Sequence, residues 1–169
     1  MPNSHCTSVW PRLPVVAVMV WVGLVLSGPN VIAQTRAKTC EVKITTPSPG
    51  DKVGREGRVR GTAKIPDGTF LWVFAHMKDL AAEWWPQGGR AAIINKEDGS
   101  WVIIVGYGQQ QDVKEDFEVA AAVVDGNTNA QLRQWYLQAQ KTGSYPPIEF
   151  PSVVDGCPPV KVAVVKTSH

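Results

Sequence analysis

The sequence is poor in the residues from which most metal and catalytic sites are built. It holds 3 cysteines and 3 histidines, with no Cys-x-x-Cys spacing and no paired histidines. The acidic group Asp112, Glu115 and Asp116 lacks the ligand spacing of a calcium loop, and no glycine-rich phosphate loop opens a helix. We therefore expect neither a metal ion nor another cofactor.

An excess of charge of one sign is also missing. The chain has 17 Lys and Arg residues against 15 Asp and Glu residues, a formal net charge of +2, and no long run of like charge. Because a nucleic-acid surface needs a basic stripe that follows the phosphates, we expect no nucleic-acid partner.

Histidine-based catalysis has a single candidate. His5 lies in an N-terminal segment that we expect to be removed, and His169 is the last residue, which leaves His76 in the mature body. A catalytic set built on His76 needs a carboxylate beside it and a hydroxyl in reach. Asp79 and Glu83 are near in sequence, but no strained nucleophile turn accompanies them.

Paired carboxylates, as in glycoside hydrolysis, are the other catalytic option. The candidates are Asp79, Glu83, Asp98, Asp112, Glu115, Asp116 and Asp125. Most of them stand in predicted turns, where carboxylates accept backbone hydrogen bonds. We therefore expect that the protein is not an enzyme, and the alternative is a hydrolase that acts on glycans.

The one long apolar run lies near the N-terminus. Residues 13–26 read LPVVAVMVWVGLVL, follow Arg12 and contain no acidic residue. This run is shorter than the roughly 20 residues of a membrane span and has the length of a signal-peptide core. We predict a signal peptide over 1–33 that is cleaved after Ala33. The alternative is an uncleaved membrane anchor.

Cleavage would also remove Cys6 and leave Cys40 and Cys157 in a chain bound for an oxidising compartment. Two such cysteines allow one pairing, so we predict a disulfide between them rather than two buried thiols. A short tail over 34–39 and one domain over 40–169 would follow the signal peptide. The expected location is periplasmic or extracellular, with membrane contact only through the signal peptide before cleavage.

Alternation of apolar and polar residues predicts about seven short strands. We place them at 41–46, 58–63, 70–77, 91–95, 100–105, 116–124 and 160–165. The strand at 70–77, FLWVFAHM, is apolar on both faces, which predicts a central strand covered on both sides. The strand at 116–124 has one nearly smooth face, formed in part by Ala120 and Ala122.

The period changes to three and four residues over 127–140, where Leu132, Trp135, Tyr136 and Ala139 recur. This spacing predicts one short helix. The strands and the helix together favour a mainly β fold, an antiparallel immunoglobulin-like sandwich closed by one disulfide. In such a fold the first and last strands commonly run side by side in parallel, which would bring Cys40 and Cys157 to the same end.

Four motifs, ITTPSPGDKV, GRVRGTA, LWVF and DGSW, resemble bacterial immunoglobulin-like domains of exported and cell-surface proteins, over residues 41–124. The resemblance implies a sandwich fold and a role as a spacer, adhesion or binding module. It implies no catalytic residues. The helix over 127–140 and the proline-rich segment that leads to Cys157 depart from this pattern, so a plain spacer is a poor description.

The pair Trp84 and Trp85 is the first candidate binding feature. Adjacent residues of a strand point to opposite sides, so one indole should face outward, where it could stack on a sugar or grip a peptide. Tyr107, Trp101 and Tyr136 could extend this surface. The alternative is that one indole covers the sheet and the other packs on a loop.

The second candidate is the face of the central strand that carries Trp72, Phe74 and His76. A monomer rarely leaves so large an apolar surface exposed, so the alternative is that the helix around Leu132 covers it. We hypothesise an exported, non-catalytic binding or interaction module whose partner is a glycan or a protein at the cell envelope. A structural, self-assembling envelope subunit is the alternative from another class.

Overall fold

The structure is a computed structural model that describes residues 39–80 and 82–167. The predicted signal peptide, its cleavage site after Ala33 and residues 34–38 of the predicted tail lie outside the described residues. None of the helices in the described ranges is both long and apolar enough to span a membrane.

Over the described residues the chain forms eight strands, a 3₁₀ turn and one helix. In chain order they are β1 (Glu41–Thr46), β2 (Lys52–Val53), β3 (Glu56–Lys64), β4 (Phe70–Met77), β5 (Trp85–Pro86), β6 (Ser100–Gly106), η1 (Gln110–Asp112), β7 (Asp116–Val124), α1 (Gly126–Thr142) and β8 (Val160–Lys166).

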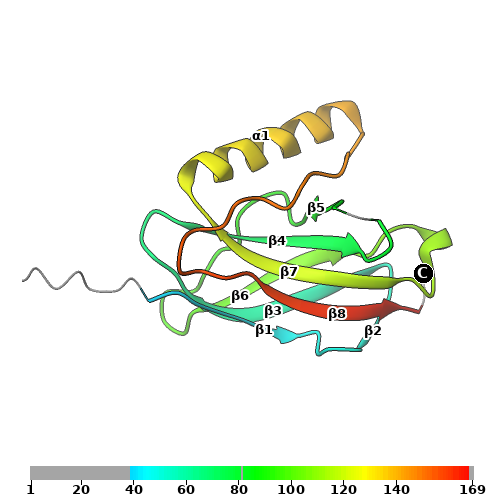
Figure 1. The fold of residues 1–169 in the computed structure, drawn as a ribbon, viewed down its shortest axis with the longest axis horizontal. Coiled ribbons are helices and arrows are strands. Elements are labelled where there is room, and N and C mark those ends of the chain that lie inside the picture. The colour runs from blue at the N-terminus through cyan, green and yellow to red at the C-terminus, as the bar shows by residue number, and fades with distance from the viewer. Residues whose placement is uncertain (1–38, 81, 168–169) are drawn as a thin grey trace, which may run out of the picture. The chain divides into compact units, whose positions relative to one another are not determined.

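Two sheets are formed, and both are visible in Figure 1. The small sheet has the order β1-β3-β6, and the large sheet has the order β2-β8-β7-β4-β5. The helix α1 lies over the large sheet, on the side away from the small sheet. The predicted mainly β fold with one helix and one disulfide is therefore confirmed.

The strands predicted over 41–46, 70–77 and 116–124 have the predicted bounds, and three others are longer by one to three residues. The strand predicted over 91–95 is wrong. That segment has no regular structure and reaches β4 through one backbone bond, from Ala92 N–H to the Leu71 carbonyl at 2.7 Å. It carries the chain from one sheet to the other, so its apolar residues pack without a ladder.

The parallel pairing expected beside the last strand is present, but β2 makes it and not the first strand. β1 pairs antiparallel with β3 in the small sheet, while β2 pairs parallel with β8 in the large sheet. The turn after β1 carries the chain across: Ser48 N–H donates to Asp51 Oδ2 at 2.7 Å, and Gly50 N–H donates to the Ala163 carbonyl at 2.8 Å. A two-residue strand therefore takes the place beside β8 that the sequence predicts for the whole first strand.

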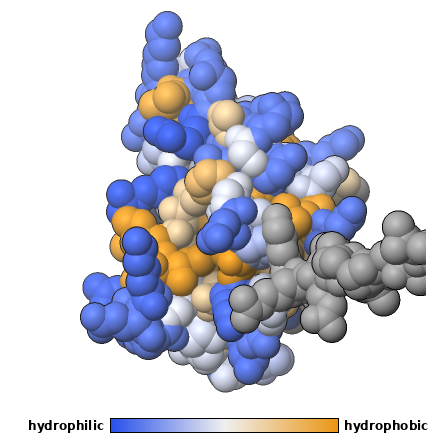
Figure 2. All heavy atoms as spheres, turned by 90° about the vertical axis from the view of Figure 1, so that its left-hand side faces the viewer, coloured by the Kyte–Doolittle hydropathy of each residue, from blue (hydrophilic) through white to orange (hydrophobic). Residues whose placement is uncertain are grey.

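Period-two alternation divides the large sheet between two cores. In β4, Leu71, Val73 and Ala75 face the small sheet, whereas Trp72 and Phe74 face α1. The same division holds in β7. Figure 2 shows apolar residues in a band across one end of the fold, with hydrophilic residues around them.

The predicted disulfide is confirmed. Cys40 and Cys157, which are 117 residues apart in sequence, form a disulfide with 5.4 Å between their Cα atoms. Cys40 precedes β1 of the small sheet and Cys157 precedes β8 of the large sheet, so one covalent bond joins the two sheets at the same end.

The double substitution Cys40→Ser and Cys157→Ser should lower the free energy of unfolding by roughly 2–5 kcal/mol, because the bond closes a long loop in the unfolded chain. Denaturant unfolding followed by tryptophan fluorescence measures the loss. The reduced wild-type protein should lose a similar amount, and an unchanged unfolding midpoint in both samples would contradict the prediction.

Candidate functional site

The aromatic face of β4 is covered and offers no docking surface. Trp72 and Phe74 are fully buried, and Leu132 of α1 packs in the same cluster. Trp72 Nε1 donates to Asn129 Oδ1 of α1 at 3.0 Å. The alternative prediction, in which the helix around Leu132 covers this face, is confirmed, so Trp72 and Phe74 are not exposed to a partner.

The segment that follows α1 also covers the aromatic face of β4. Phe150 stacks edge-on against Phe74 at 5.3 Å between ring centroids, and against Trp84 at 4.7 Å. Trp84 and Ile148 exchange both backbone hydrogen bonds at 2.9 Å. Trp84 is therefore 5% exposed and covers the sheet, as the alternative prediction has it for one of the two indoles.

His76 packs against Trp84 on the same face of β4. Its ring stacks on Trp84 with 4.6 Å between centroids, and its Nδ1 lies 2.8 Å from the Glu83 carbonyl oxygen, so that nitrogen carries the proton. Glu83 reaches His76 through its backbone and not through its carboxylate. His76 is 8% exposed and was wrongly predicted as a surface residue.

Tyr107 points into the core between the sheets. It is 1% exposed and packs edge-on against Phe117 at 5.9 Å. The inward alternation of β6, at Trp101, Ile103 and Val105, continues to this residue, so the same period that predicted β6 also predicts a buried Tyr107. Tyr107 and Trp101 are therefore both wrong as surface residues. Burial raises the pKa of Tyr107 to about 12.

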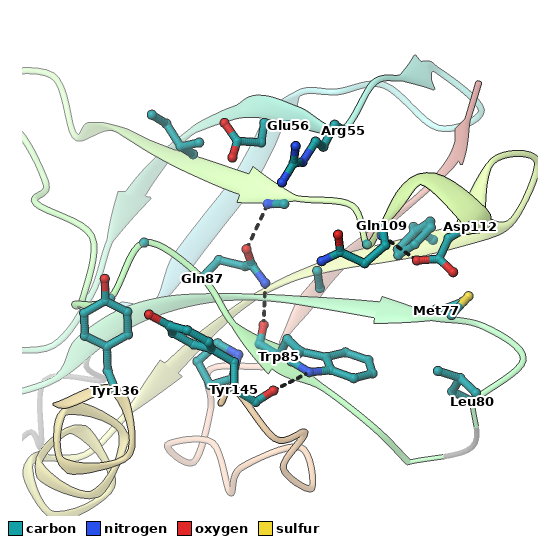
Figure 3. A pocket seen from close by; sticks show the side chains of 18 of the residues that line it. Arg55, Glu56, Met77, Leu80, Trp85, Gln87, Gln109, Asp112, Tyr136 and Tyr145 are labelled. Carbon is teal, nitrogen blue, oxygen red and sulfur yellow. Dashed lines mark hydrogen bonds between the residues drawn. The ribbon is translucent and has the colours of Figure 1, made fainter. Parts of the chain in front are cut away.

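Trp85 takes the outward position of the tryptophan pair. The two adjacent indoles point to opposite sides of β5, as predicted, and Trp85 is half-buried. Its Nε1 donates to the Tyr145 carbonyl at 3.1 Å. Gln87 then links β5 to β6, because its Nε2 donates to the Trp85 carbonyl at 2.9 Å and its Oε1 accepts from Gly106 N–H at 2.9 Å (Figure 3).

These residues form part of the wall of a groove of about 750 Å³. The groove lies where the edges of the two sheets, β5 and β6, face each other, and the second half of α1 closes one side (Figure 3). Its apolar and aromatic lining includes Met77, Leu80, Trp85, Ile104, Phe117, Trp135, Tyr136 and Tyr145. Its polar lining includes Arg55, Glu56, Gln87, Gln109 and Asp112.

Gly89 and Gly108, both with positive φ, shape this wall. Gly89 has φ +68°, and a Cβ atom there would lie 2.3 Å from the Tyr136 ring, so glycine lets the helix approach the chain. Gly108 has φ +64°, and a Cβ atom there would lie 2.3 Å from Asp112 Oδ2. That carboxylate folds back to accept from Gln109 N–H at 2.5 Å, which fixes the loop at the end of the groove.

Three of the seven acidic residues considered for catalysis, Asp98, Asp112 and Asp125, accept backbone hydrogen bonds in turns or at a helix start. Asp98 accepts from Ser100 N–H at 2.8 Å and Asp125 accepts from Thr128 N–H at 2.7 Å. These backbone hydrogen bonds lower the pKa of each carboxyl below its ordinary value. Of the acidic candidates, Asp112 alone lines the groove. Within residues 39–80 and 82–167, no three His, Cys, Asp or Glu side chains are grouped to hold a metal ion.

Sequence reasoning identified Trp85 and Tyr136 and missed most of the groove. Met77, Leu80 and Tyr145 come from three different segments, and no single motif contains them. A signal for Tyr145 was present, since it stands directly before two prolines and after the helix-ending Gly143.

Comparison with known proteins gives little further information. No model of a known protein family matches the chain, and no curated protein matches it either. Among solved structures, the chain is similar to murine CRIg, with a TM-score of 0.29 and 5% sequence identity over 78% of this chain and 98% of that chain.

The substitution Asn129→Ala should lower the free energy of unfolding by about 1–3 kcal/mol, because it leaves the buried Trp72 indole N–H without an acceptor. Urea unfolding measures the change. In a Trp72→Phe background the same substitution should cost much less, since no donor is left to satisfy. Equal losses in both backgrounds would contradict a role for this bond.

The buried phenol of Tyr107 should make stability fall as pH rises above 10.0. The unfolded chain releases this proton near the ordinary pKa of 10.0, whereas the folded chain holds it until about 12. Because the unfolded state loses the proton first, the stabilisation that comes from the protonated phenol is complete below pH 10.0. It is lost as the pH rises from 10.0 to about 12. The stability difference between wild type and Tyr107→Phe, measured on both sides of pH 10.0, isolates this effect, and a constant difference would contradict it.

Proposed function

We propose that this chain is an exported, non-catalytic binding module of immunoglobulin-like shape, which holds a segment of a protein partner in the groove between β5 and β6. The observation that carries the proposal is the groove itself, a half-open space of about 750 Å³ with a mainly apolar and aromatic wall. Such walls, with a few fixed polar groups, are typical of binding sites.

The wall is already in place in the unbound chain. The bonds from Trp85 to Tyr145 and from Gln87 to Trp85 and Gly106 connect three segments across the groove. A preformed site loses little conformational entropy when a ligand binds. Met77 and Leu80 add flexible apolar surface at the other side, which suits side chains of varied shape.

The exported and non-catalytic parts of the proposal have separate support. A disulfide between Cys40 and Cys157 is stable in an oxidising compartment. His76 is engaged by Trp84 and the Glu83 backbone, and Asp112 by the backbone of its own loop, so neither is poised for proton transfer in the groove.

A glycan is the second candidate ligand, because the groove carries flat rings. Trp85, Tyr136 and Tyr145 line one side, and the amide of Gln109 stands near the other. Aromatic rings can stack on sugar rings while amides bond to hydroxyl groups. Binding measurements on peptide and glycan arrays distinguish a protein segment from a glycan.

The substitution Trp85→Ala should weaken binding at least about tenfold, because it removes an indole ring from the groove wall, and central aromatic residues dominate most interfaces. Binding of the mature domain to a peptide array and to a glycan array measures the effect, and the class of array that responds identifies the ligand. Thermal melting of the variant confirms that it is folded.

Two controls accompany this experiment. Trp85→Phe keeps a ring and should retain part of the affinity. Leu137→Ala changes a residue of α1 that is 59% exposed and lies outside the groove, so it should bind like wild type. Equal binding of Trp85→Ala and wild type on every array would remove the groove as the site.

A further inference from the structure

The outer edge of β6 carries backbone groups that point away from the sheet. Beyond the two ends of the β3–β6 ladder, Tyr107 N–H donates to the Arg55 carbonyl and Ala63 N–H to the Gly99 carbonyl, both at 2.8 Å. In an antiparallel ladder bonded and non-bonded pairs alternate. Counting inward from both ends, Trp101, Ile103 and Val105 bond to β3, so the N–H and C=O groups of Val102 and Ile104 face outward.

The outward edge is bounded at both ends. At one end, the Ser100 carbonyl accepts from Asn95 N–H at 2.8 Å, and at the other, Gly106 N–H donates to Gln87 Oε1. These two bonds lie on the side of β6 away from β3, which agrees with the alternation. Between them, within the described residues, the outward N–H and C=O groups of Val102 and Ile104 form no hydrogen bond.

The side chains beside this edge are exposed and apolar. Val102 is 52% exposed, Ile104 is 57% exposed, and Ile93, on the segment that leads into β6, is 69% exposed. Exposed apolar residues on a free strand edge form a template for a further strand. The edge therefore offers both backbone bonding groups and apolar side-chain contacts.

The two ends of the edge differ in charge. Ile104 and Gly106 line the groove described above. Val102 and Ser100 line a separate hollow of about 620 Å³ that contains Arg60 and Arg90 and no carboxylate. Among the described residues neither arginine forms a salt bridge, since the one ion pair joins Lys161 to Glu118.

We propose that the partner of this module is an extended peptide segment that adds as a strand to the outer edge of β6, with apolar residues at alternate positions and an acidic residue at the end near Arg60 and Arg90. This inference rests on the proposed function, since it names how the segment in the groove is held. The added strand would lie about 4.8 Å from β6 and bond to Val102 and Ile104.

Charge decides between a foreign segment and a second copy of β6. The side chains that β6 presents on the outer face are those of Ser100, Val102, Ile104 and Gly106, none of which is acidic. An identical strand would therefore leave Arg60 and Arg90 without a counter-charge. A segment with a carboxylate at that end supplies one, so the acidic peptide fits the edge better than self-pairing.

The test uses synthetic peptides of 7 residues, the length of β6, in which Val or Ile alternates with Thr and a Glu or Asp occupies one end or the other. Each peptide that binds is then methylated at one backbone nitrogen at a time. In an added strand only every second residue faces β6, so methylation should weaken binding at least about tenfold at alternate positions and little between them.

Outcomes of the peptide scan separate the inference from the proposed function. Loss of binding with period two supports strand addition. If peptides bind, lose affinity for the Trp85→Ala variant and show no period-two pattern in the methylation scan, strand addition is overturned and the groove remains the binding site. Absence of saturable binding by every peptide overturns the inference. Concentration-dependent dimers in size-exclusion chromatography that are lost in Ile104→Pro would assign the edge to a second copy instead.

Variants of the protein give an independent reading. Ile104→Pro removes one outward N–H and no bond to β3, so it should weaken the peptide at least about tenfold, whereas Ile104→Val keeps the N–H and should not. Arg60→Glu should weaken peptides with an acidic residue at the matching end and spare those without one. Equal effects on both peptide sets would remove the charge assignment, and the methylation scan remains decisive if Ile104→Pro fails to fold.

Discussion

The central strands β4 and β7 must be covered on both faces, and the rest of the structure depends on how this is achieved. Trp72, Phe74, Ala120 and Ala122 are all 0% exposed on the face away from the small sheet. Leaving these side chains in water would cost several kcal/mol, since burial of one large apolar side chain contributes about 1.5–3 kcal/mol. The helix α1 and the segment around Phe150 provide the cover, and the small alanines let them approach closely.

The cover in turn determines where the groove lies. Because Leu132 and Ala139 of α1 face the large sheet, Trp135 and Tyr136 lie on the flank of the helix, beside β5. The segment that follows α1 then brings Tyr145 against the rings of Trp135 and Tyr136, at centroid distances of 6.1 and 6.2 Å. An arrangement needed to bury β4 therefore gathers an aromatic wall at the edge of the sandwich.

Sequence patterns predicted what local periodicity encodes and little beyond it. The two-sided burial of β4, the smooth face of β7 and the helix around Leu132 follow from spacing along single segments. The alternation of β6 also encodes the burial of Tyr107, since Trp101, Ile103 and Val105 face the core at the same period. The crossing from β1 to β2, the irregular segment over 91–95 and the groove depend on which distant segments meet, and no local period carries that information.

The edges of the two sheets show why β6 stands apart. The large sheet ends in β2 and β5, each 2 residues long, and β5 includes Pro86, so neither edge presents a long template. At the other edge of the small sheet, β1 carries an irregularity between Ile44 and Thr46. β6 has 7 residues, no proline, no charged side chain and no register shift. Three edges are protected in ways that natural sheets use against unwanted pairing, while the fourth keeps the outward backbone groups of Val102 and Ile104 unbonded, between the bonds from Asn95 and Gln87 and beside the groove. That contrast is what a strand reserved for a partner would produce.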